Sequence, residues 1–459
     1  MSPTLLRPIR ADELLNRRCR AVDDDSLAAA RAILEDLDAG GDAAALDHAR
    51  RLGDLRDGQP YVYAPAALAD ARDRLPTHQR ALLERTADRI RAFAAAQRAC
   101  LTNLTLPIPG GEAGHTCIPV RSAGCYAPGG RFPLPSSVLM TAVTARAAGV
   151  QQVWVASPRP TDATLAAASV AGADGLLAIG GVQAIGALAR GLLGVPKGGC
   201  DIIVGPGNRW VTAAKHLVSG EVGIDMLAGP SELLILADAT ADPALIAADL
   251  IAQAEHDEDA VPMLVITEPA LAPLVEAALY RQLSTLPTAA TVGVSLRNGF
   301  VVVAETMDEA IDLVDQVAPE HLELMSAHAS DIDRRISNAG AVFIGSMSAE
   351  VLGDYGAGPN HVLPTGGTSR FRAGLSVFSF LRTRTWLRID DPISARASFL
   401  DASSLARLEC LEGHARSADS RVKSSSASPF GTSISSESDA RFWPPDKAPL
   451  SFRYRDNSA

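Results

Sequence analysis

The chain contains the stretch IAQAEHDEDA at residues 251–260, in which Gln253 and His256 stand three residues apart at the end of an apolar helix. The sequence predicts that this helix begins at Pro243, directly after Asp242, because proline suits the first turn of a helix. Residues three apart lie on one face of a helix, so both polar side chains point the same way. A histidine nitrogen suits zinc, and a glutamine oxygen is a rarer ligand. Alone, such a pair is more often a polar helix end than a metal site.

A second candidate group is PEHLEL at residues 319–324. Pro319 is expected to end the preceding helix, which leaves Glu320 and His321 at the junction between a loop and a strand. A carboxylate next to an imidazole at such a position can divide the work of proton transfer. An exposed polar turn of the same composition is common, so the motif by itself leaves both interpretations open.

The segment GDYGAGPNHVLPTGG at residues 353–367 is rich in glycine and leaves little room for regular structure. A long glycine-rich loop of this kind is often functional. Its Asp354 offers a hard oxygen ligand for a metal ion, and His361 is either a further ligand or a brace for the loop. The sequence therefore adds Asp354 to the candidate metal ligands.

Glu409 and His414 lie farther along, in LECLEGHA at residues 408–415. They are placed on a predicted helix that spans residues 402–422, close to Gly413. Nothing in the local pattern distinguishes them from polar residues at the end of a surface helix. Their spacing alone therefore gives them no function.

Glycine-rich turns follow three of the predicted strands, at residues 126–130, 179–183 and 201–208. Such turns let the backbone approach a phosphate, and the helix that follows offers free N–H groups and the positive end of its dipole. The chain has no GxGxxG fingerprint, and glycines at strand ends usually form ordinary turns. The turns alone leave nucleotide binding open.

These candidate residues must be positioned by a larger framework. Residues 25–100 carry apolar side chains at three- and four-residue spacing, which predicts helices. From about residue 117, short apolar strands alternate with helices, and a second alternating run begins at residue 231. Alternation of this kind is typical of a parallel sheet covered on both faces, so we expect two α/β units.

Composition limits the class of protein. A chain of 459 residues is too long for one hydrophobic core, so two or more domains are expected. Its net charge of −11 disfavours nucleic-acid binding. We expect no membrane span, because no apolar run reaches about 18 residues, and the N-terminus lacks the apolar centre of a signal peptide. The six cysteines are scattered without a CxxC pair, which is typical of reduced thiols and favours a cytoplasmic location.

The C-terminal part of the chain differs from the rest. Residues 376–422 combine a strand pattern at 383–389 with the helix that carries Glu409 and His414, and this unit is too small to form its own core. Residues 423–459 are rich in serine and proline and show no periodicity. We expect this tail to be disordered and assign it no function.

Taken together and in order along the chain, these segments resemble the histidinol dehydrogenase family. The match runs to about residue 422 and includes YAPGG, GGVQAIGALA, VGPGN, IDMLAGPSE, AQAEH, PEHLE, GDYGAGPNHVLPT and the helix with Glu409 and His414. The Ser-rich tail is not part of the family pattern. The resemblance implies an α/β fold of two Rossmann-like domains with parallel sheets, plus small N- and C-terminal dimerisation arms.

The same resemblance implies a division of the chain. The expected parts are an N-terminal arm (1–30), a first α/β domain with the metal and catalytic residues (31–110 packed with 230–375), a second, NAD-binding α/β domain (111–229), a C-terminal dimer arm (376–422) and the tail (423–459).

The resemblance also implies a function. L-histidinol would be oxidised in two steps, through L-histidinaldehyde, to L-histidine, the last step of histidine biosynthesis, with NAD as the cofactor. It implies a cytoplasmic homodimer with shared active sites and one zinc ion per subunit. Carried over to matching positions, the implied zinc ligands are Gln253, His256, Asp354 and His414, the last supplied by the partner subunit. The implied catalytic pair is Glu320 and His321, and the implied cofactor contacts are Tyr126, Gln183 and Asn208. The implied substrate contacts are Ser231, Gln253, His256, His321, Asp354, Glu409 and His414.

The implied chemistry is consistent with these residue types. A ligand set of nitrogens and oxygens without thiolate accepts Zn²⁺ and also Mn²⁺ or Co²⁺. The imidazole and amine of histidinol can bind such an ion, which then orients the substrate. His321 would remove the alcohol proton as the hydride leaves, and Glu320 would activate the water that hydrates the aldehyde.

Three alternatives remain open at this point. A relative of the family could oxidise another amino alcohol or diol, although Glu409 and His321, the residues expected to recognise imidazole, are both present. A zinc hydrolase could use Glu320 to activate water and bind no dinucleotide; the missing GxGxxG favours it, and two α/β units favour a dehydrogenase. A catalytically idle metal-binding protein is the third, and the intact Glu320–His321 pair argues against it.

Overall fold

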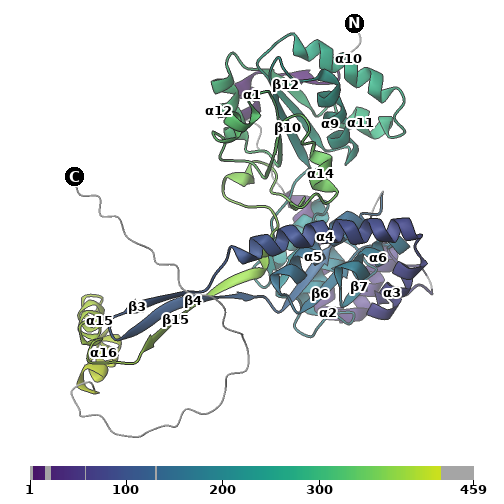
Figure 1. Cartoon of the computed structure of the whole chain (residues 1–459). Coiled ribbons are helices and arrows are strands. Elements are labelled where there is room, and N and C mark those ends of the chain that lie inside the picture. Colours follow the sequence, from purple (N-terminus) through teal and green to yellow (C-terminus); the bar gives the residue numbers. More distant parts are fainter. Residues whose placement is uncertain (1–3, 16–21, 57, 130–131, 425–459) are drawn as a thin grey trace, which may run out of the picture. The chain divides into compact units, whose positions relative to one another are not determined.

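The structure is a computed structural model that describes residues 4–15, 22–56, 58–129 and 132–424 (Figure 1). Its chain divides into two compact units. Unit 1 comprises Met1–Leu104 and His115–Arg384, and unit 2 comprises Thr105–Gly114 and Thr385–Ala459. Residues 425–459 lie outside the described part, so the expected disorder of the tail stays a prediction.

One half of unit 1 is built on a six-stranded sheet, here called the β5 sheet, of order β2-β7-β6-β5-β8-β9. Neighbouring strands are parallel, except that β2 is antiparallel to β7. The strands are β2 (Val62–Tyr63), β5 (Ser122–Tyr126), β6 (Gln152–Ala156), β7 (Gly175–Leu177), β8 (Ile202–Val204) and β9 (Gly223–Ile224), and the helices between them are α5 (Pro135–Ala148), α6 (Asp162–Ala171), α7 (Gly181–Arg190) and α8 (Arg209–Val218).

The other half of unit 1 is built on a six-stranded, fully parallel sheet, the β10 sheet, of order β1-β12-β11-β10-β13-β14. Its strands are β1 (Arg7–Pro8), β10 (Glu232–Ala237), β11 (Val261–Ile266), β12 (Phe300–Val303), β13 (His321–Met325) and β14 (Ala341–Ile344). Its helices are α1 (Ala11–Leu15), α9 (Pro243–Glu255), α10 (Leu271–Leu283), α11 (Ala289–Ser295), α12 (Met307–Val317), α13 (Ala329–Asp333) and α14 (Glu350–Asp354).

Side chains of β10 alternate between two apolar layers, one on each face of this sheet. Leu233 and Ile235 join the core beneath α9 and α10, whereas Leu234 and Leu236 join the core beneath α12. Successive side chains of a strand point to opposite faces, and both faces are buried here. This explains why the strand reads as a continuous apolar run in the sequence.

The expected α/β fold of two Rossmann-like domains is confirmed, because both sheets have the Rossmann-like strand order, and the two dimerisation arms stay a prediction. In each sheet the first strand of the run, β5 or β10, lies in the middle. The second and third strands follow on one side, and the fourth and fifth lie on the other. Each sheet therefore has a topological switch point, between β5 and β8 and between β10 and β13.

The helices expected within residues 31–110 differ from expectation, because they pack mainly on the β5 sheet. Their contact with residues 230–375 includes Arg89, whose Nε donates to the Gly356 carbonyl (2.7 Å). Helix α2 (Asp24–Arg51) packs against α7 and α8, α3 (Pro65–Arg74) against α6, and α4 (Thr77–Ala99) against α5. Their buried side chains share one core with the β5 sheet. Amphipathic spacing predicts a buried helix face but does not say which sheet the face covers.

The described part of the N-terminal region, residues 1–30, packs on the chain's own sheets, and its expected role as a dimerisation arm stays a prediction. Strand β1 pairs with β12 at the edge of the chain's own β10 sheet, and α1 packs on α12. Residues 1–3 and 16–21 lie outside the described part. Helix α2 then begins at Asp24, where the Asp23 side chain accepts a hydrogen bond from the Ser26 N–H and caps the helix.

Unit 2 and the strands that lead into it contain a three-stranded sheet of order β15-β4-β3. The strands are β3 (Leu104–Ile108), β4 (Gly111–Pro119) and β15 (Leu381–Ile389), and the 3-10 turns η1 (Thr368–Arg370) and η2 (Val377–Phe380) precede β15. The hairpin of β3 and β4 was not predicted. The strand expected at 383–389 is confirmed within β15.

The single helix expected at residues 402–422 is in fact two helices that pack against each other, α15 (Arg396–Leu408) and α16 (Glu412–Ser424). The break lies at Cys410, whose φ of 61° is left-handed. A non-glycine residue with positive φ is uncommon. The periodic pattern runs on through the break, so the sequence gives no sign of it.

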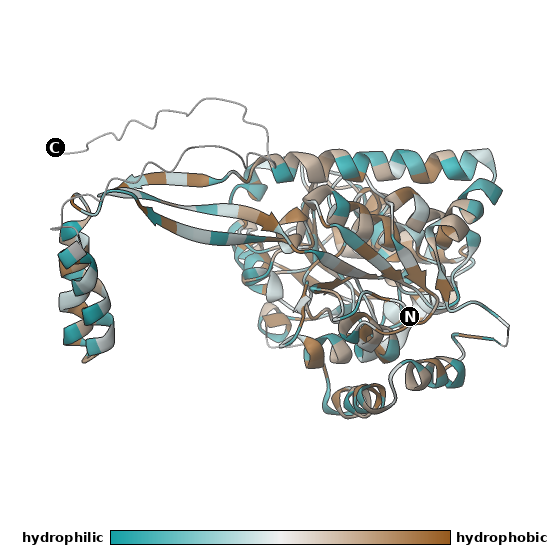
Figure 2. Cartoon of the chain, turned by 90° about the horizontal axis from the view of Figure 1, so that it is seen from below, coloured by the Kyte–Doolittle hydropathy of each residue, from teal (hydrophilic) through white to brown (hydrophobic). Residues whose placement is uncertain are grey.

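Figure 2 shows that the two helices of unit 2 carry hydrophobic residues among hydrophilic ones. Large apolar side chains of this unit are exposed in the single chain: Leu387, Ile393, Leu400, Leu405, Leu408 and Leu411. No helix in the described residues is long and apolar enough to cross a membrane.

Candidate active site

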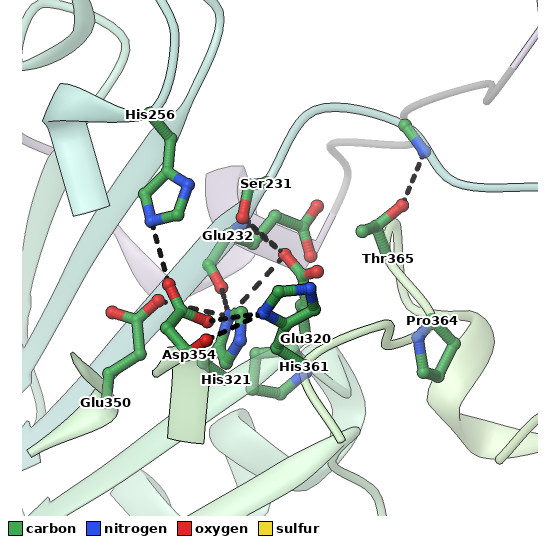
Figure 3. Close-up of polar contacts among 12 residues, drawn as sticks. Ser231, Glu232, His256, Glu320, His321, Glu350, Asp354, His361, Pro364 and Thr365 are labelled. Atoms are coloured by element: carbon green, nitrogen blue, oxygen red, sulfur yellow. Dashed lines mark hydrogen bonds and ion pairs between the residues drawn. The ribbon is translucent and has the colours of Figure 1, made fainter. Parts of the chain in front are cut away.

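Ser231 and Glu320 meet because they precede neighbouring parallel strands. Strands β10 and β13 pair in the register Leu233↔His321, so the residues before them lie together at the amino ends of both strands. The Ser231 hydroxyl donates a hydrogen bond to Glu320 Oε2 (2.8 Å), and the Glu232 backbone N–H donates to the same oxygen (2.8 Å) (Figure 3).

Burial makes Glu320 a strong base when it is ionised. The residue is 7% exposed. Burial raises the pKa of the Glu320 carboxyl well above its usual range, and the two hydrogen bonds from Glu232 and Ser231 oppose this only in part. A carboxyl group with a raised pKa is suited to general acid–base catalysis near neutral pH.

His321 is held as a neutral imidazole with a free basic nitrogen. Its Nδ1 lies 3.0 Å from the Glu232 carbonyl oxygen, which can only accept, so Nδ1 carries the hydrogen. Burial lowers the pKa of His321 to about 4, which keeps the ring neutral at physiological pH. Its Nε2 is buried and has no partner among the described residues. This arrangement leaves Nε2 as a proton acceptor.

His256 and Asp354 form a pair beside this base. The predicted helix α9 begins at Pro243 with Asp242 as its N-cap, and His256 lies at its C-cap. His256 Nε2 is 3.1 Å from Asp354 Oδ2, and Asp354 is the last residue of the short helix α14 (Figure 3). Two candidate metal ligands distant in sequence are therefore in contact.

The charges of this pair support each other. Burial raises the pKa of Asp354, but the hydrogen bond to His256 and the nearby histidines lower it by more, so the net pKa lies below the usual range. Burial likewise opposes the charged form of His256, but Asp354 favours that form more strongly and raises the pKa of the imidazole. An ionised carboxylate that attracts positive charge is a suitable ligand for a cation.

Gln253, one helical turn before His256, is fully buried, and neither atom of its amide has a partner among the described residues. A buried amide without partners is costly, so native proteins rarely leave one unsatisfied. An ion near His256 and Asp354 would remove the part of that cost that comes from the amide oxygen, by coordinating it. The unsatisfied amide fits a metal ligand better than an ordinary polar helix end.

Glu350 belongs to the same cluster and was missed from the sequence. Ligand atoms of His256, Glu350 and Asp354 lie within 4.8 Å of one another. Glu350 is 2% exposed, neither of its carboxyl oxygens has a hydrogen-bond partner among the described residues, and Oε1 is 3.5 Å from His321 Nδ1. Burial raises the pKa of Glu350 well above its usual range, and the neighbouring carboxylates add to this. One glutamate in a stretch without a motif gives no local signal.

His361, whose role the sequence left open, braces the glycine-rich loop. Its Nδ1 donates to the backbone carbonyl of Asp354 (3.0 Å), and its Nε2 is 3.3 Å from the Ser137 hydroxyl. Burial lowers the pKa of His361. With both ring nitrogens engaged, His361 positions Asp354 and is a poor candidate for a ligand.

The three predicted cofactor contacts lie at the carboxyl ends of the β5 sheet. Tyr126 is the last residue of β5, and its hydroxyl accepts a hydrogen bond from the Gly181 N–H (3.2 Å) at the start of α7. Gln183 lies in the same first turn. Asn208 follows β8 and caps α8, where its Oδ1 accepts from the N–H groups of Trp210 and Val211 (3.2 Å each).

Close approach of the backbone at this switch point requires glycine. Gly205, directly after β8, has a φ of 118°, and a Cβ on it would lie 2.0 Å from the Tyr126 carbonyl oxygen. No larger residue fits without moving the end of β5. Lys215 and Asp225 form a buried ion pair beside this turn, and both contact Gly205 through its carbonyl and N–H.

Comparison with known proteins identifies the family. The histidinol dehydrogenase family model matches residues 16–422. A histidinol dehydrogenase of Thermus thermophilus is 46% identical over 393 residues, which is 85% of this chain and 93% of the relative. One of Ralstonia nicotianae is 41% identical over 416 residues, covering 88% and 93%.

The chain belongs to the histidinol dehydrogenase family. The crystal structure of histidinol dehydrogenase from Elizabethkingia anophelis is similar at a TM-score of 0.86 and 29% identity, and the match covers 92% of this chain and 99% of that one. Membership of this family makes the chain a dehydrogenase.

Two residues carried over from the histidinol dehydrogenase family, Glu409 and His414, lie outside the group around Asp354. Glu409 is the C-cap of α15, and His414 lies in the first turn of α16. Both are exposed and belong to unit 2, whereas Ser231, Glu320, His321, His256 and Asp354 come together in unit 1.

Proposed function

We propose that the chain oxidises L-histidinol to L-histidine through L-histidinaldehyde, with NAD⁺ as the hydride acceptor and a metal site that takes zinc. The observation that carries the proposal is the free, buried Nε2 of His321, held beside the His256–Asp354 pair. A base and a cation site in one cluster are what an alcohol oxidation needs, because the alcohol must lose a proton while the substrate is held still.

His321 acts as the base for the alcohol. Its Nε2 accepts the hydroxyl proton as the hydride leaves, and Nδ1–H stays on the Glu232 carbonyl and fixes the ring. The nearby Asp354 carboxylate favours the charged form of the ring and stabilises it once it has taken the proton. The low pKa of about 4 returns the proton readily before the next step.

Glu320 acts on water in the second half of the reaction. Histidinaldehyde must be hydrated before a second hydride can leave its carbon, and this requires removal of a proton from water. Glu320, with its raised pKa, accepts that proton, while Ser231 and the Glu232 N–H hold the carboxylate in place.

Gln253, His256 and Asp354 would hold the metal ion, and the unsatisfied amide of Gln253 supports this. A zinc ion bound by them would orient the substrate through its imidazole and amine nitrogens. We assign the fourth ligand to His414 of the partner subunit. The exposed position of His414 in unit 2 leaves it accessible to another chain.

The homodimer is supported by the apolar surface of unit 2. Its exposed leucines, Leu405 and Leu408 among them, are 58% and 82% exposed in the single chain. Leu405 and Leu408 lie three residues apart and so share one face of α15, and an exposed apolar face usually marks an interface. A two-fold dimer would cover them and place Glu409 and His414 of the partner subunit in the other chain's site, where Glu409 would bind the substrate imidazole.

The direct test mixes the purified protein with L-histidinol and NAD⁺ and follows the absorbance band of reduced nicotinamide. The expected result is two molecules of NADH for each histidinol, because the alcohol and aldehyde steps each release one hydride. Formation of a single NADH would reject the second oxidation. Absence of NADH from metal-replete protein would reject the proposed activity and favour a hydrolase or an idle metal-binding protein.

The shared site is tested by mixing two inactive variants, His321→Ala and His414→Ala, after dissociation and reassociation. In a crossed dimer, one site receives both defects and the other receives neither. Random pairing makes about half of the dimers mixed, each with one good site, so about a quarter of normal activity should return. An exchanged mixture without activity would place His414 in its own chain's site or outside any site.

A further inference from the structure

Asp54 connects the loop after α2 to the predicted cofactor residues. Its Oδ2 accepts a hydrogen bond from the Gly180 N–H (2.8 Å) and another from Gln183 Nε2 (2.8 Å). Asp54 is itself fixed by its own N–H, which donates to the Ala49 carbonyl at the end of α2 (2.9 Å). Nothing in the sequence pattern pointed to it, because its partners are 126 and 129 residues away.

The carboxylate determines which way the Gln183 amide points. A carboxylate oxygen can only accept, so the amide nitrogen of Gln183 faces Asp54 and Oε1 faces away. Gln183 is 1% exposed, and its Oε1 has no partner among the described residues. Beside this oxygen lies Gly181, where a Cβ would come within 3.1 Å of it. Gln183 is thus held with Oε1 as an unpaired acceptor beside Gly181, which has no side chain.

The same contacts close the start of α7 to a phosphate. The Gly180 N–H donates to Asp54, and the Gly181 N–H donates to the Tyr126 hydroxyl. At α8 the side chain of Asn208 takes two of the first N–H groups. Dinucleotide folds with a GxGxxG turn place the diphosphate on such free N–H groups. In this chain, side chains of the protein itself accept hydrogen bonds from these N–H groups, which agrees with the absence of a GxGxxG motif.

We propose that Asp54 is a positioning residue for the dinucleotide. It holds Gln183 so that Oε1 accepts a hydrogen bond from an O–H or N–H donor of the cofactor, and it keeps the diphosphate away from the N-terminus of α7. This inference rests on the proposed use of NAD⁺. It concerns how the cofactor is held, and the tests below separate the two.

The first test measures NAD⁺ binding by titration calorimetry in the metal-replete protein without substrate. Asp54→Ala should weaken binding about tenfold, the effect of losing one oriented hydrogen bond. Binding should be rescued in Asp54→Asn, because both bonds go to a single oxygen that asparagine keeps. Asp54→Glu, which keeps the charge but moves the oxygens, should bind weakly like Asp54→Ala and serves if the alanine variant does not fold.

The matched control is Asp174→Ala in the same half of unit 1. Asp174 Oδ2 also accepts from one backbone N–H, that of Val153, and one side chain, that of Arg146. Both alanine variants should lower the melting temperature similarly, but only Asp54→Ala should lose NAD⁺ affinity. Equal loss of affinity in both would reduce Asp54 to a structural role and overturn the inference.

A double-mutant cycle with Gln183→Ala shows whether Asp54 acts through Gln183. Once Gln183 is gone, Asp54→Ala should cause little further loss of affinity. Additive losses would overturn the inference, as would unchanged affinity in Asp54→Ala when the parent protein binds NAD⁺. A parent protein that does not bind NAD⁺ at all would instead overturn the proposed function.

Discussion

The β5 and β10 sheets have the same strand order but carry their candidate residues at opposite ends of the strands. In the β5 sheet, Tyr126 ends β5 and Gly205 directly follows β8, so the group lies at the carboxyl ends, where open α/β sheets usually bind ligands. In the β10 sheet, Ser231 directly precedes β10 and Glu320 precedes β13, so the group lies at the amino ends.

This difference has an electrostatic consequence. Helices between parallel strands begin at the carboxyl ends and finish at the amino ends. The amino ends of the β10 sheet therefore receive the C-terminus of α9, with Gln253 and His256, where free carbonyls and the negative end of the dipole favour a cation. The carboxyl ends of the β5 sheet receive the N-termini of α7 and α8, whose first N–H groups donate to side chains of Asp54, Tyr126 and Asn208. One framework thus supplies a cation site in one sheet and, in the other, helix N-termini that are capped by the chain's own side chains.

Replacing the bases of the β10 sheet should have the largest effect. His321→Asn should slow oxidation of both histidinol and added histidinaldehyde, since each step needs proton removal, and Glu320→Gln should slow the aldehyde step more. Losses on the order of 10²- to 10⁴-fold are expected for a positioned acid or base. Rapid kinetics of the two half-reactions measure this, with NAD⁺ affinity unchanged as the control. Equal slowing of both steps in Glu320→Gln would exclude its action on water.

The two acids beside His256 should differ in their effect on the metal. The histidine neighbours hold the pKa of Asp354 below its usual range, whereas burial raises the pKa of Glu350 well above its own, so Asp354 is the more readily ionised of the two. Asp354→Asn should therefore lower zinc affinity by at least about 10- to 100-fold, whereas Glu350→Gln should retain zinc. Competition with a chelating dye measures both. If Glu350→Gln loses as much zinc as Asp354→Asn, Glu350 is a ligand.

Local signals explain what the sequence predicted in the site. The three-residue spacing of Gln253 and His256 fixes a shared helix face whatever the fold, and Pro319 fixes the end of α12 just before Glu320 and His321. Each of these depends on neighbours in the sequence. The strand–helix alternation that predicted two parallel sheets is equally local.

The missed features depend on contacts between distant segments. Glu350 becomes part of the site only because α14 packs against α9 and the Glu350 N–H donates to Glu323 Oε1 of β13 (2.7 Å). Asp54 reaches Gln183 only because α2 covers the β5 sheet. The sequence had instead placed this region with residues 230–375. The left-handed Cys410 lies between α15 and α16, which pack against each other. No pattern within a short window encodes these pairings.

Buried acids in the β10 sheet should make its stability depend on pH. Burial raises the pKa of Asp249, and burial together with the charge of Asp249 raises the pKa of Glu323 to about 8. The folded-state pKa of Glu323 thus exceeds the unfolded value near 4.5, so its contribution to stability is full below pH 4.5 and is lost as the pH rises to 8.

Glu323→Gln removes the titrating carboxyl group and with it the loss of stability at high pH. The variant should therefore be more stable than the parent protein at pH 8, by on the order of 1–3 kcal/mol, but little more stable at pH 5. Urea unfolding at both pH values measures the difference, and the same change at exposed Glu84 of α4 is the control. A gain that is equal at the two pH values would show that Glu323 does not titrate between them.

The smallest effect is expected at the carboxyl ends of the β5 sheet, at Asn208. Its Oδ1 caps α8, and its exposed amide is a predicted cofactor contact. Asn208→Ala should lower the free energy of unfolding by about 1 kcal/mol through loss of the cap. Asn208→Asp keeps the cap oxygen and should keep the stability, yet it replaces an N–H donor with a negative charge and should weaken NAD⁺ binding. Stability and affinity that fall together in both variants would mean that Asn208 only caps the helix, and the β5 sheet would then hold the cofactor through Tyr126 and Gln183 alone.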